Sequence, residues 1–329
     1  MGRYRIGGTG GGYLLAKVCT AAHRAHRLCI LYIDDDLLLL YKKGDIYHKA
    51  LMECIRSADV LWTSNQNVSE KYGKIASQDT KIVETVLLEP WEKVSPYVAE
   101  DAGVGILFAG SPTHEKIVRK YILPAIRKVH RLYPEIRILF VGYKDTSIAE
   151  TEPYIDTTKW FYDAGQYREY VTGQRMQIGL AVIEDNEFGR CKFFNKYLEY
   201  SKLGIMGLYS ACEPYTFAVT DGVNGILVNN TVEDWEAAIL RAIREPALRE
   251  QCVSNAQEDL MKKYTTEAVI RSVEQAIPEI CEYAAPDLRV RFFHFLWLLN
   301  IWQLLVRCFE HPRYAIKKIS SKGREIFKG

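Results

Sequence analysis

Short apolar runs alternate with amphipathic stretches along most of this sequence, and the alternation predicts a parallel α/β protein. The clearest case begins at Gly179 to Glu184 (GLAVIE), a β-branched run typical of a buried parallel strand. From Lys192 to Lys202 the apolar residues recur at helical spacing, with Phe194, Tyr197, Leu198 and Ser201 on one side. Gly204 is expected to end this helix, and Ile205 to Tyr209 forms the next strand.

Charged residues on this helix could hold a ligand. In open α/β sheets ligands bind beyond the carboxyl ends of strands, often at a helix N-terminus that favours anions. Lys192 is predicted on the first helical turn, and Glu199 lies about two turns further on. The spacing suggests a phosphate at one end and a sugar ring at the other. The alternative is an amphipathic helix whose Lys and Glu are merely solvated.

Three further strands are predicted before residue 90, and they give a βα series of three or four parallel strands. They are Leu28–Ile33, Asp59–Ser64 and Lys81–Thr85. The first ends at Asp34, Asp35 and Asp36, carboxylates that could bind a divalent metal or cap the next helix. The Gly-rich stretch Gly7–Gly12 lacks the preceding strand that a dinucleotide-binding loop requires.

A second series of elements begins after a proline-containing segment, Leu88–Asp101, which is interpreted as a linker. Its predicted elements are a strand at Gly105–Gly110, a loop at Ser111–His114, a helix at Glu115–Tyr133, strands at Ile136–Gly142 and Trp160–Tyr162, a helix at Tyr167–Gly173, a loop at Ala211–Thr216, and a long helix at Thr265–Ala285. The glycine at position 110 would let backbone N–H groups approach an anion closely, although an ordinary turn would look the same.

Composition narrows the class of protein. The 329 residues are enough for two domains, and 48% hydrophobic with 26% charged residues is ordinary for a globular protein. A net charge of +2 gives no argument for nucleic-acid binding. The eight Cys show no metal-like spacing, so we expect reduced thiols in a cytosolic protein. The sequons at Asn67 and Asn229 would then be inert, and no signal peptide is recognised.

The residues from Gly103 to about Tyr264 resemble the C-terminal, donor-binding domain of GT-B glycosyltransferases of the retaining family 4 type. KYLEYSKLGIMGLYS resembles the helix-strand signature of that family, and FGRCK resembles the branch in which a Lys precedes the signature Glu by seven residues. DGVNGILVNN and EDWEAAILRAI (Asp221 to Ile243) resemble its turn, strand and following helix. The segment Ser57–Lys74 is similar to part of the N-terminal domain of some members.

The resemblance implies two Rossmann-like domains with an abbreviated first one, because the earlier strands of that domain have no counterpart here. The chain would be either an N-terminally truncated member or one with a reduced first domain. The expected organisation is a partial acceptor-side domain (1–90), a linker (91–103), a nucleotide-sugar donor domain with a return helix (104–285) and a tail (286–329). The three aspartates would then cap the next helix or lie on the acceptor side rather than bind a metal. The Gly-rich stretch would be a flexible start or an acceptor-side loop. The implied substrate is a nucleotide-sugar, with no metal or other cofactor required.

The resemblance also nominates site residues. Lys192, Arg190 and Glu187 are the catalytic candidates, and the donor-binding candidates are Gly110, Ser111, His114, Asn195, Glu199 and Tyr215. The first Glu of the family's usual pair would fall at Cys191, and Glu187 is displaced from it by four positions. Which of the three catalytic candidates contacts the transferred sugar therefore stays open.

The C-terminal tail carries a separate signal. Its apolar core, Phe292–Val306, is interrupted by polar residues and is shorter than the roughly 20 residues that a membrane span requires. Large aromatic residues followed by a basic segment are typical of an interfacial helix on an anionic membrane. We therefore expect a cytoplasmic protein, peripheral at the inner face of the membrane, with a glycan or lipid-linked acceptor. A helix packed on the first domain, or an oligomer interface, is the alternative.

Two functions from other classes compete with the transferase interpretation. One is a catalytically inactive scaffold that keeps a nucleotide-binding domain, which the abbreviated first domain would favour. The other is a membrane-peripheral binding protein without a nucleotide site.

Overall fold

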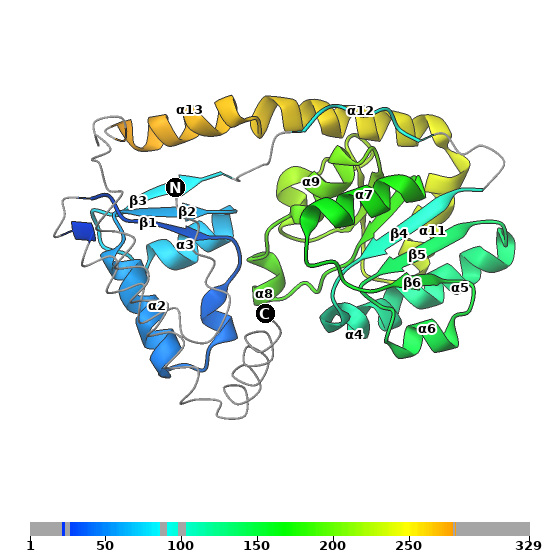
Figure 1. Ribbon diagram of the computed structural model, residues 1–329, viewed down its shortest axis with the longest axis horizontal. Coiled ribbons are helices and arrows are strands. Elements are labelled where there is room, and N and C mark those ends of the chain that lie inside the picture. Colours follow the sequence, from blue (N-terminus) through cyan, green and yellow to red (C-terminus); the bar gives the residue numbers. More distant parts are fainter. Residues whose placement is uncertain (1–21, 24–26, 86–90, 98–102, 279, 281–329) are drawn as a thin grey trace, which may run out of the picture. The chain divides into compact units, whose positions relative to one another are not determined.

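The computed structural model describes two compact units, each built on a parallel β-sheet (Figure 1). One unit comprises the chain up to Glu84 together with the segment from Ser272, and the other comprises Thr85 to Arg271. The described residues are 22–23, 27–85, 91–97, 103–278 and 280. The Gly-rich stretch at 7–12 and the tail from residue 286 lie outside them, so their predicted roles stay predictions.

The first unit contains three described strands in the order β1-β2-β3, all parallel. They are β1 (Ile30–Ile33), β2 (Val60–Thr63) and β3 (Lys81–Glu84), with helices α2 (Ile46–Ser57) and α3 (Gln66–Gly73) and a 3-10 turn η1 (Leu37–Leu40). The strands confirm the predicted series. Buried Ile33, Leu61 and Val83 place the core of this unit along the sheet.

Asp36 does not cap the turn that follows it, so the capping interpretation is wrong for this residue. Its fully buried carboxylate instead forms an ion pair with Lys71, at 2.5 Å between Nζ and Oδ2. It also accepts a hydrogen bond from the Tyr72 hydroxyl, which in turn accepts one from the backbone N–H of Leu38. No His, Cys, Asp or Glu cluster suited to a metal ion occurs among the described residues.

The second unit is a six-stranded parallel sheet in the order β6-β5-β4-β7-β8-β9. The strands are β4 (Gly105–Ala109), β5 (Arg137–Val141), β6 (Asp156–Thr158), β7 (Ile178–Ala181), β8 (Met206–Ser210) and β9 (Ile226–Val228). The chain enters at β4, proceeds outward to β6, and then returns to the other side of β4 as β7. The direction of the winding therefore reverses between β4 and β7.

Helices cover both faces of this sheet, as in a doubly wound fold (Figure 1). One face carries α4 (Glu115–Ile117), the π-helical turn η3 (Val118–Ile122), α5 (Leu123–Leu132) and α11 (Val232–Arg244); the other carries α7 (Ala164–Gln174), α9 (Asn195–Lys202) and α12 (Pro246–Lys263). Along β4, Ile106 and Phe108 contribute to the first core, and Leu107 and Ala109 to the second. This alternation of buried residues is what a strand covered on both faces requires.

Several further elements occur in the described part of the chain. They are η2 (Pro112–His114), α6 (Ser147–Thr151), α8 (Glu187–Arg190), α10 (Tyr215–Ala218) and α13 (Thr266–Ala276). The long helix predicted from Thr265 ends at Ala276, before the expected Ala285. Within the part of the chain that the structure describes, no helix is both long and apolar enough to cross a membrane.

The predicted strand at Trp160–Tyr162 is wrong, because the strand of this region is β6, a few residues earlier. It lies at the edge of the sheet, where a polar sequence is tolerated. The Thr158 carbonyl accepts hydrogen bonds from the backbone N–H groups of Gly142 and Tyr143, at 2.8 and 3.0 Å.

Gly204 ends α9 as the sequence predicts. Its φ is +69°, a left-handed conformation that suits a glycine just beyond a helix. A Cβ here would lie 3.1 Å from Val94 Cγ2 and 3.2 Å from the Ser95 carbonyl oxygen. The segment 91–97 therefore runs close over the end of α9.

We predict that Gly204→Ala lowers the free energy of unfolding by about 1–2 kcal/mol, the cost of a left-handed residue with a side chain. Gly173→Ala is the matched control: Gly173 lies near the end of α7, is exposed, and has open space around it. It should stabilise by about 0.5–1 kcal/mol. Urea unfolding followed by circular dichroism measures both. Equal effects of the two substitutions would contradict the assignment of Gly204.

Candidate functional site

The candidate site lies where the winding of the second unit reverses. The connection after β4 leads toward β5, and the connection after β7 leads toward β8 on the other side. A ligand in an open parallel sheet binds in the crevice that such diverging connections leave at the carboxyl ends of the strands. Two segments meet at this point: 110–114, after β4, and 182–194, after β7. Most residues nominated from the sequence belong to them.

The turn after β4 is held by short contacts. His114 Nδ1 lies 3.3 Å from the carbonyl oxygen of Ser111, which also accepts a hydrogen bond from the Tyr143 hydroxyl at 3.1 Å. Gly142, at the end of β5 with φ +97°, is pressed against this turn, because a Cβ there would lie 2.2 Å from the Gly110 carbonyl oxygen. Gly110, Ser111 and His114 are therefore brought together, as the sequence predicts.

Two lysines from the other side of the reversal act on His114. Burial lowers the pKa of the His114 imidazole, and the positive charge of Lys192 lowers it further, with a smaller contribution from Lys196. A hydrogen bond to the Ser111 backbone opposes these effects. The imidazole is consequently held toward its neutral form beside two ammonium groups. The end of β4 and the connection after β7 thus share one electrostatic environment.

Lys192 does not lie on the first turn of α9 as predicted, because that helix begins three residues later at Asn195. The backbone N–H of Lys192 donates instead to the Gly189 carbonyl at 3.0 Å and closes the turn that follows α8. Its Nζ lies 5.0 Å from the ring centroid of Phe188. Lys192 is half-buried in the loop between α8 and α9.

The short helix α8 is fixed by its own cap. Asn186 Oδ1 accepts a hydrogen bond from the Gly189 N–H at 2.8 Å. A Cβ on Gly189 would lie 2.0 Å from the Glu184 carbonyl oxygen, so the loop folds back tightly. Glu187 opens this helix with an exposed side chain. Arg190 Nε forms a half-exposed ion pair with Asp185 at 2.7 Å, which raises the pKa of Arg190.

Helix α9 contributes Glu199, whose carboxylate is bound by Lys196 and Tyr167. Lys196 Nζ lies 2.7 and 2.8 Å from the two carboxylate oxygens of Glu199. The Tyr167 hydroxyl, from α7, donates a second hydrogen bond to Glu199. Burial and then the charge of Glu199 raise the pKa of Tyr167 well above its usual range. Glu199 is thus oriented before any ligand arrives.

Lys196 is a candidate that the sequence interpretation missed. It lies between the Tyr167 and Tyr200 rings, with its Nζ 5.6 and 5.7 Å from their centroids, and it also influences His114. The signal that could have found it is its position three residues before Glu199, where two residues of a helix face each other.

The remaining nominated residues lie at the margin of this group. Asn195 is exposed at the first position of α9. Tyr215 is buried and packs on Tyr209, with 4.9 Å between ring centroids. Burial raises the Tyr215 pKa first, with the charge of Glu199 adding to the effect. Their contact with a donor stays a prediction.

An exposed aromatic side chain borders the site on its other side. Trp160 follows β6 with 48% of its surface exposed, and its Cε3 lies 3.3 Å from where a Cβ on Gly142 would be. Because Gly142 contacts Gly110, the indole lies close to the turn after β4. The sequence interpretation assigned Trp160 to a strand and so missed it.

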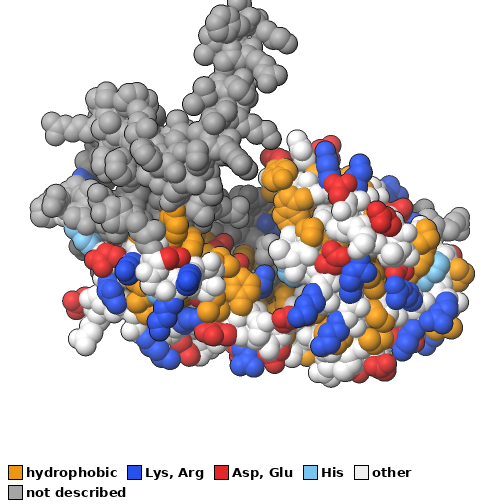
Figure 2. All heavy atoms as spheres, turned by 90° about the horizontal axis from the view of Figure 1, so that it is seen from below, with side chains coloured by type: hydrophobic (Ala, Val, Ile, Leu, Met, Phe, Trp, Pro, Cys, Tyr) orange, Lys and Arg blue, Asp and Glu red, His pale blue; other side chains and the backbone are white. Residues whose placement is uncertain are grey.

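The surface shown in Figure 2 carries side chains of both charges. On the face shown in Figure 2, Lys and Arg side chains are interspersed with Asp and Glu over the described surface.

The fold described above is that of the GT-B glycosyltransferases, whose solved structures are its structural neighbours. Neither a protein-family model nor a curated protein matches the sequence. HepE from Anabaena, in complex with UDP and glucose, has a TM-score of 0.56 and 15% identity over 83% of this chain and 76% of its own. Sucrose-phosphate synthase from Thermosynechococcus elongatus has a TM-score of 0.58 and 12% identity over 83% and 73%. The pneumococcal O-GlcNAc transferase GtfA, in complex with UDP and GlcNAc, has a TM-score of 0.55 and 14% identity over 79% of this chain and 53% of its own. At these identities the likeness establishes the fold.

The electrostatic link between the two loops can be tested without any ligand. We predict that the His114 pKa lies below 6.5, the usual value, and rises toward it in Lys192→Met and by less in Lys196→Met. Removing a nearby positive charge makes protonation of the imidazole easier. NMR titration of the His resonances, with His114→Asn to assign the signal, measures the shift. An unchanged His114 pKa in both variants would show that the lysines do not act electrostatically on His114.

Proposed function

We propose that this chain is a glycosyltransferase that moves a sugar from a nucleotide-sugar to a hydroxyl acceptor with retention of anomeric configuration. The observation that carries the proposal is the group formed by His114, Lys192 and Lys196 beside the Gly110 turn, at the reversal of a GT-B sheet. An anionic diphosphate is the ligand that such a group would favour. The UDP complexes of the structural neighbours HepE and GtfA support UDP as the first nucleotide to test.

Charge stabilisation would supply the catalysis. The bond between the anomeric carbon and the diphosphate breaks, a bond to the acceptor oxygen forms on the same face, and the acceptor proton passes to the departing diphosphate. Lys192 and Lys196 would stabilise the negative charge that develops on the leaving group. These ammonium groups would do the work that a metal ion does elsewhere, so we propose that no metal or cofactor is needed.

The other nominated residues would orient the donor. Glu199, already oriented by Lys196 and Tyr167, would accept hydrogen bonds from the ribose hydroxyls. The exposed indole of Trp160 offers a flat apolar surface to the base. Glu187 and Arg190, on the loop after β7, would contact the transferred sugar; Arg190 would have to exchange its Asp185 partner to do so.

The acceptor proposal rests on the sequence of the tail. Its aromatic and basic residues favour attachment to the cytoplasmic face of a membrane. The acceptor would then be a lipid-linked or growing surface glycan, and the pathway cell-surface polysaccharide or glycolipid synthesis.

Nucleotide binding is the first test. UDP should raise the melting temperature by several degrees, since a ligand at a hundredfold excess over its Kd stabilises the folded state by about 2.7 kcal/mol. Lys192→Ala and Glu199→Ala should lose most of the shift. Lys262→Ala, an exposed lysine of α12, is the control that should retain it.

A panel of UDP, GDP, ADP and TDP identifies the base. No shift with any of them would refute the transferase proposal. A shift without turnover of any nucleotide-sugar would instead favour the inactive nucleotide-binding scaffold.

The role of Trp160 can be measured separately. UDP should quench the fluorescence of the wild-type protein, and Trp160→Ala should bind UDP about five- to 150-fold more weakly, since stacking on a base contributes roughly 1–3 kcal/mol. Trp160→Phe should recover part of the loss. Tyr162→Ala removes a neighbouring aromatic that is 98% exposed and serves as the control. Equal UDP affinity in wild type and Trp160→Ala would exclude stacking.

A further inference from the structure

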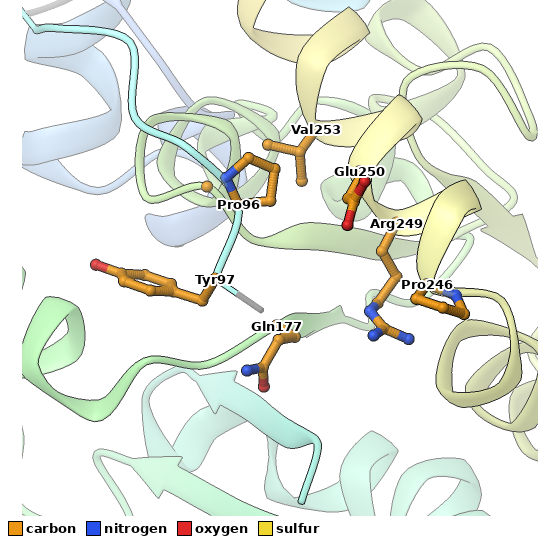
Figure 3. A pocket seen from close by; sticks show the side chains of 8 residues that line it. Pro96, Tyr97, Gln177, Pro246, Arg249, Glu250 and Val253 are labelled. Carbon is orange, nitrogen blue, oxygen red and sulfur yellow. The ribbon is translucent and has the colours of Figure 1, made fainter. Parts of the chain in front are cut away.

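A hollow in the second unit lies at the amino-terminal edge of the sheet, away from the carboxyl ends that form the candidate site (Figure 3). Two of its lining residues, Gln177 and Gly204, lie just before β7 and β8, and this places the hollow at the amino-terminal edge. Its volume is about 310 Å³, within the range of small-molecule sites. It is lined by Pro96, Tyr97, Gln177, Gly204, Pro246, Arg249, Glu250 and Val253.

The unusual feature of this hollow is a buried guanidinium. Arg249 is only 8% exposed, yet it forms no ion pair with a carboxylate among the described residues. Its Nη1 donates to the carbonyl oxygens of Ala242 and Ile243, at 2.5 and 3.0 Å, and so satisfies the end of α11. No described residue accepts a hydrogen bond from its Nε or Nη2. Arg249 Nη1 therefore stabilises the end of α11, while Nε and Nη2 remain available to a ligand.

Other donors lie near the same edge. Gln177 uses its Oε1 to accept from the Gly105 N–H at 2.6 Å, which leaves its amide Nε2 as a donor. Arg137 lies beside it: Arg137 Nη2 and Gln177 Oε1 are each 3.1 Å from where a Cβ on Gly105 would be. Arg137 Nε is itself buried without a hydrogen-bond partner. The surroundings are thus rich in positive charge and donors.

Burial of a cation without an anion is unfavourable, and burial lowers the pKa of Arg249. The only carboxylate that offsets this effect is that of the adjacent Glu250, which is exposed and also lines the hollow. A bound anion would supply the missing counter-charge and accept the hydrogen bonds that Arg249 Nε and Nη2 do not make. Glu250 would oppose the anion through repulsion.

We propose that this hollow is an anion-binding site, distinct from the nucleotide site, for a small phosphorylated metabolite. Arg249 and Gln177 bind the phosphate, and the remaining volume holds a group of about the size of a sugar. The inference rests on the hollow and its charges, and it is independent of the proposed transferase activity. Pro96 and Tyr97 belong to the segment 91–97 of the same unit, which runs close over the end of α9, so the ligand would contact that segment.

The test uses isothermal calorimetry on the full chain with two probes, inorganic phosphate and glucose 6-phosphate. We expect glucose 6-phosphate to bind, and to bind more tightly than phosphate alone because the hollow has room for the sugar. Saturating UDP should leave the affinity unchanged, as should Lys192→Ala, since both act at the other edge of the sheet. Tighter binding of phosphate alone would reassign the hollow to the free ion and overturn the metabolite proposal.

Three variants separate binding from folding. Arg249→Lys keeps a cation for the end of α11 but loses the paired donors, and it should weaken binding about 10- to 150-fold, the range for a hydrogen bond to a charged group. Glu250→Gln, an exposed substitution with little risk to folding, should tighten binding up to about fivefold by removing the repulsion. Lys262→Ala is the neutral control.

Two results would overturn the proposal. One is the absence of glucose 6-phosphate binding at millimolar concentration in a folded protein. The other is binding that UDP abolishes, or that neither Arg249→Lys nor Glu250→Gln alters, because the anion would then occupy another site.

Discussion

The contact between α9 and β7 positions the residues of the candidate site. The ring of Tyr200 lies directly on Gly179, so close that a Cβ there would be 2.6 Å from the ring. The Tyr200 hydroxyl donates to the Leu180 carbonyl at 2.8 Å, which fixes the rotation of the helix. Lys196 and Glu199, on the same helix, are held in place as a consequence. A larger residue at position 179 would displace both charges together.

The site combines an exposed rim with an oriented interior. At the rim, Arg190 and Asp185 form a half-exposed pair that contributes little to stability. Further in, Lys196 pairs with the Glu199 carboxylate and also lowers the pKa of His114, so one ammonium group acts on both side chains. Such a shared charge links the orientation of Glu199 to the charge state of His114.

The sequence predicted the elements well where burial and period agree. Phe194, Tyr197, Leu198 and Ser201 are all buried, and Gly204 has the left-handed conformation expected of a helix end. The helix α12 gave no such pattern, because its buried positions include Arg249 and Gln257. Trp160 was misassigned for a related reason: an apolar tripeptide looked like a strand, while the true strand is polar because it lies at the sheet edge.

The sequence by itself determined most of the strands and helices, the Gly110 turn and the candidate residues on each loop, because these follow from local period and turn chemistry. Only the tertiary structure decided that β7 lies beside β4, which brings Lys192 and Lys196 to His114. The same folding placed Arg249 in a hollow without a carboxylate partner among the described residues. Long-range strand pairing and the burial of single charges depend on the whole packing, which no local pattern encodes.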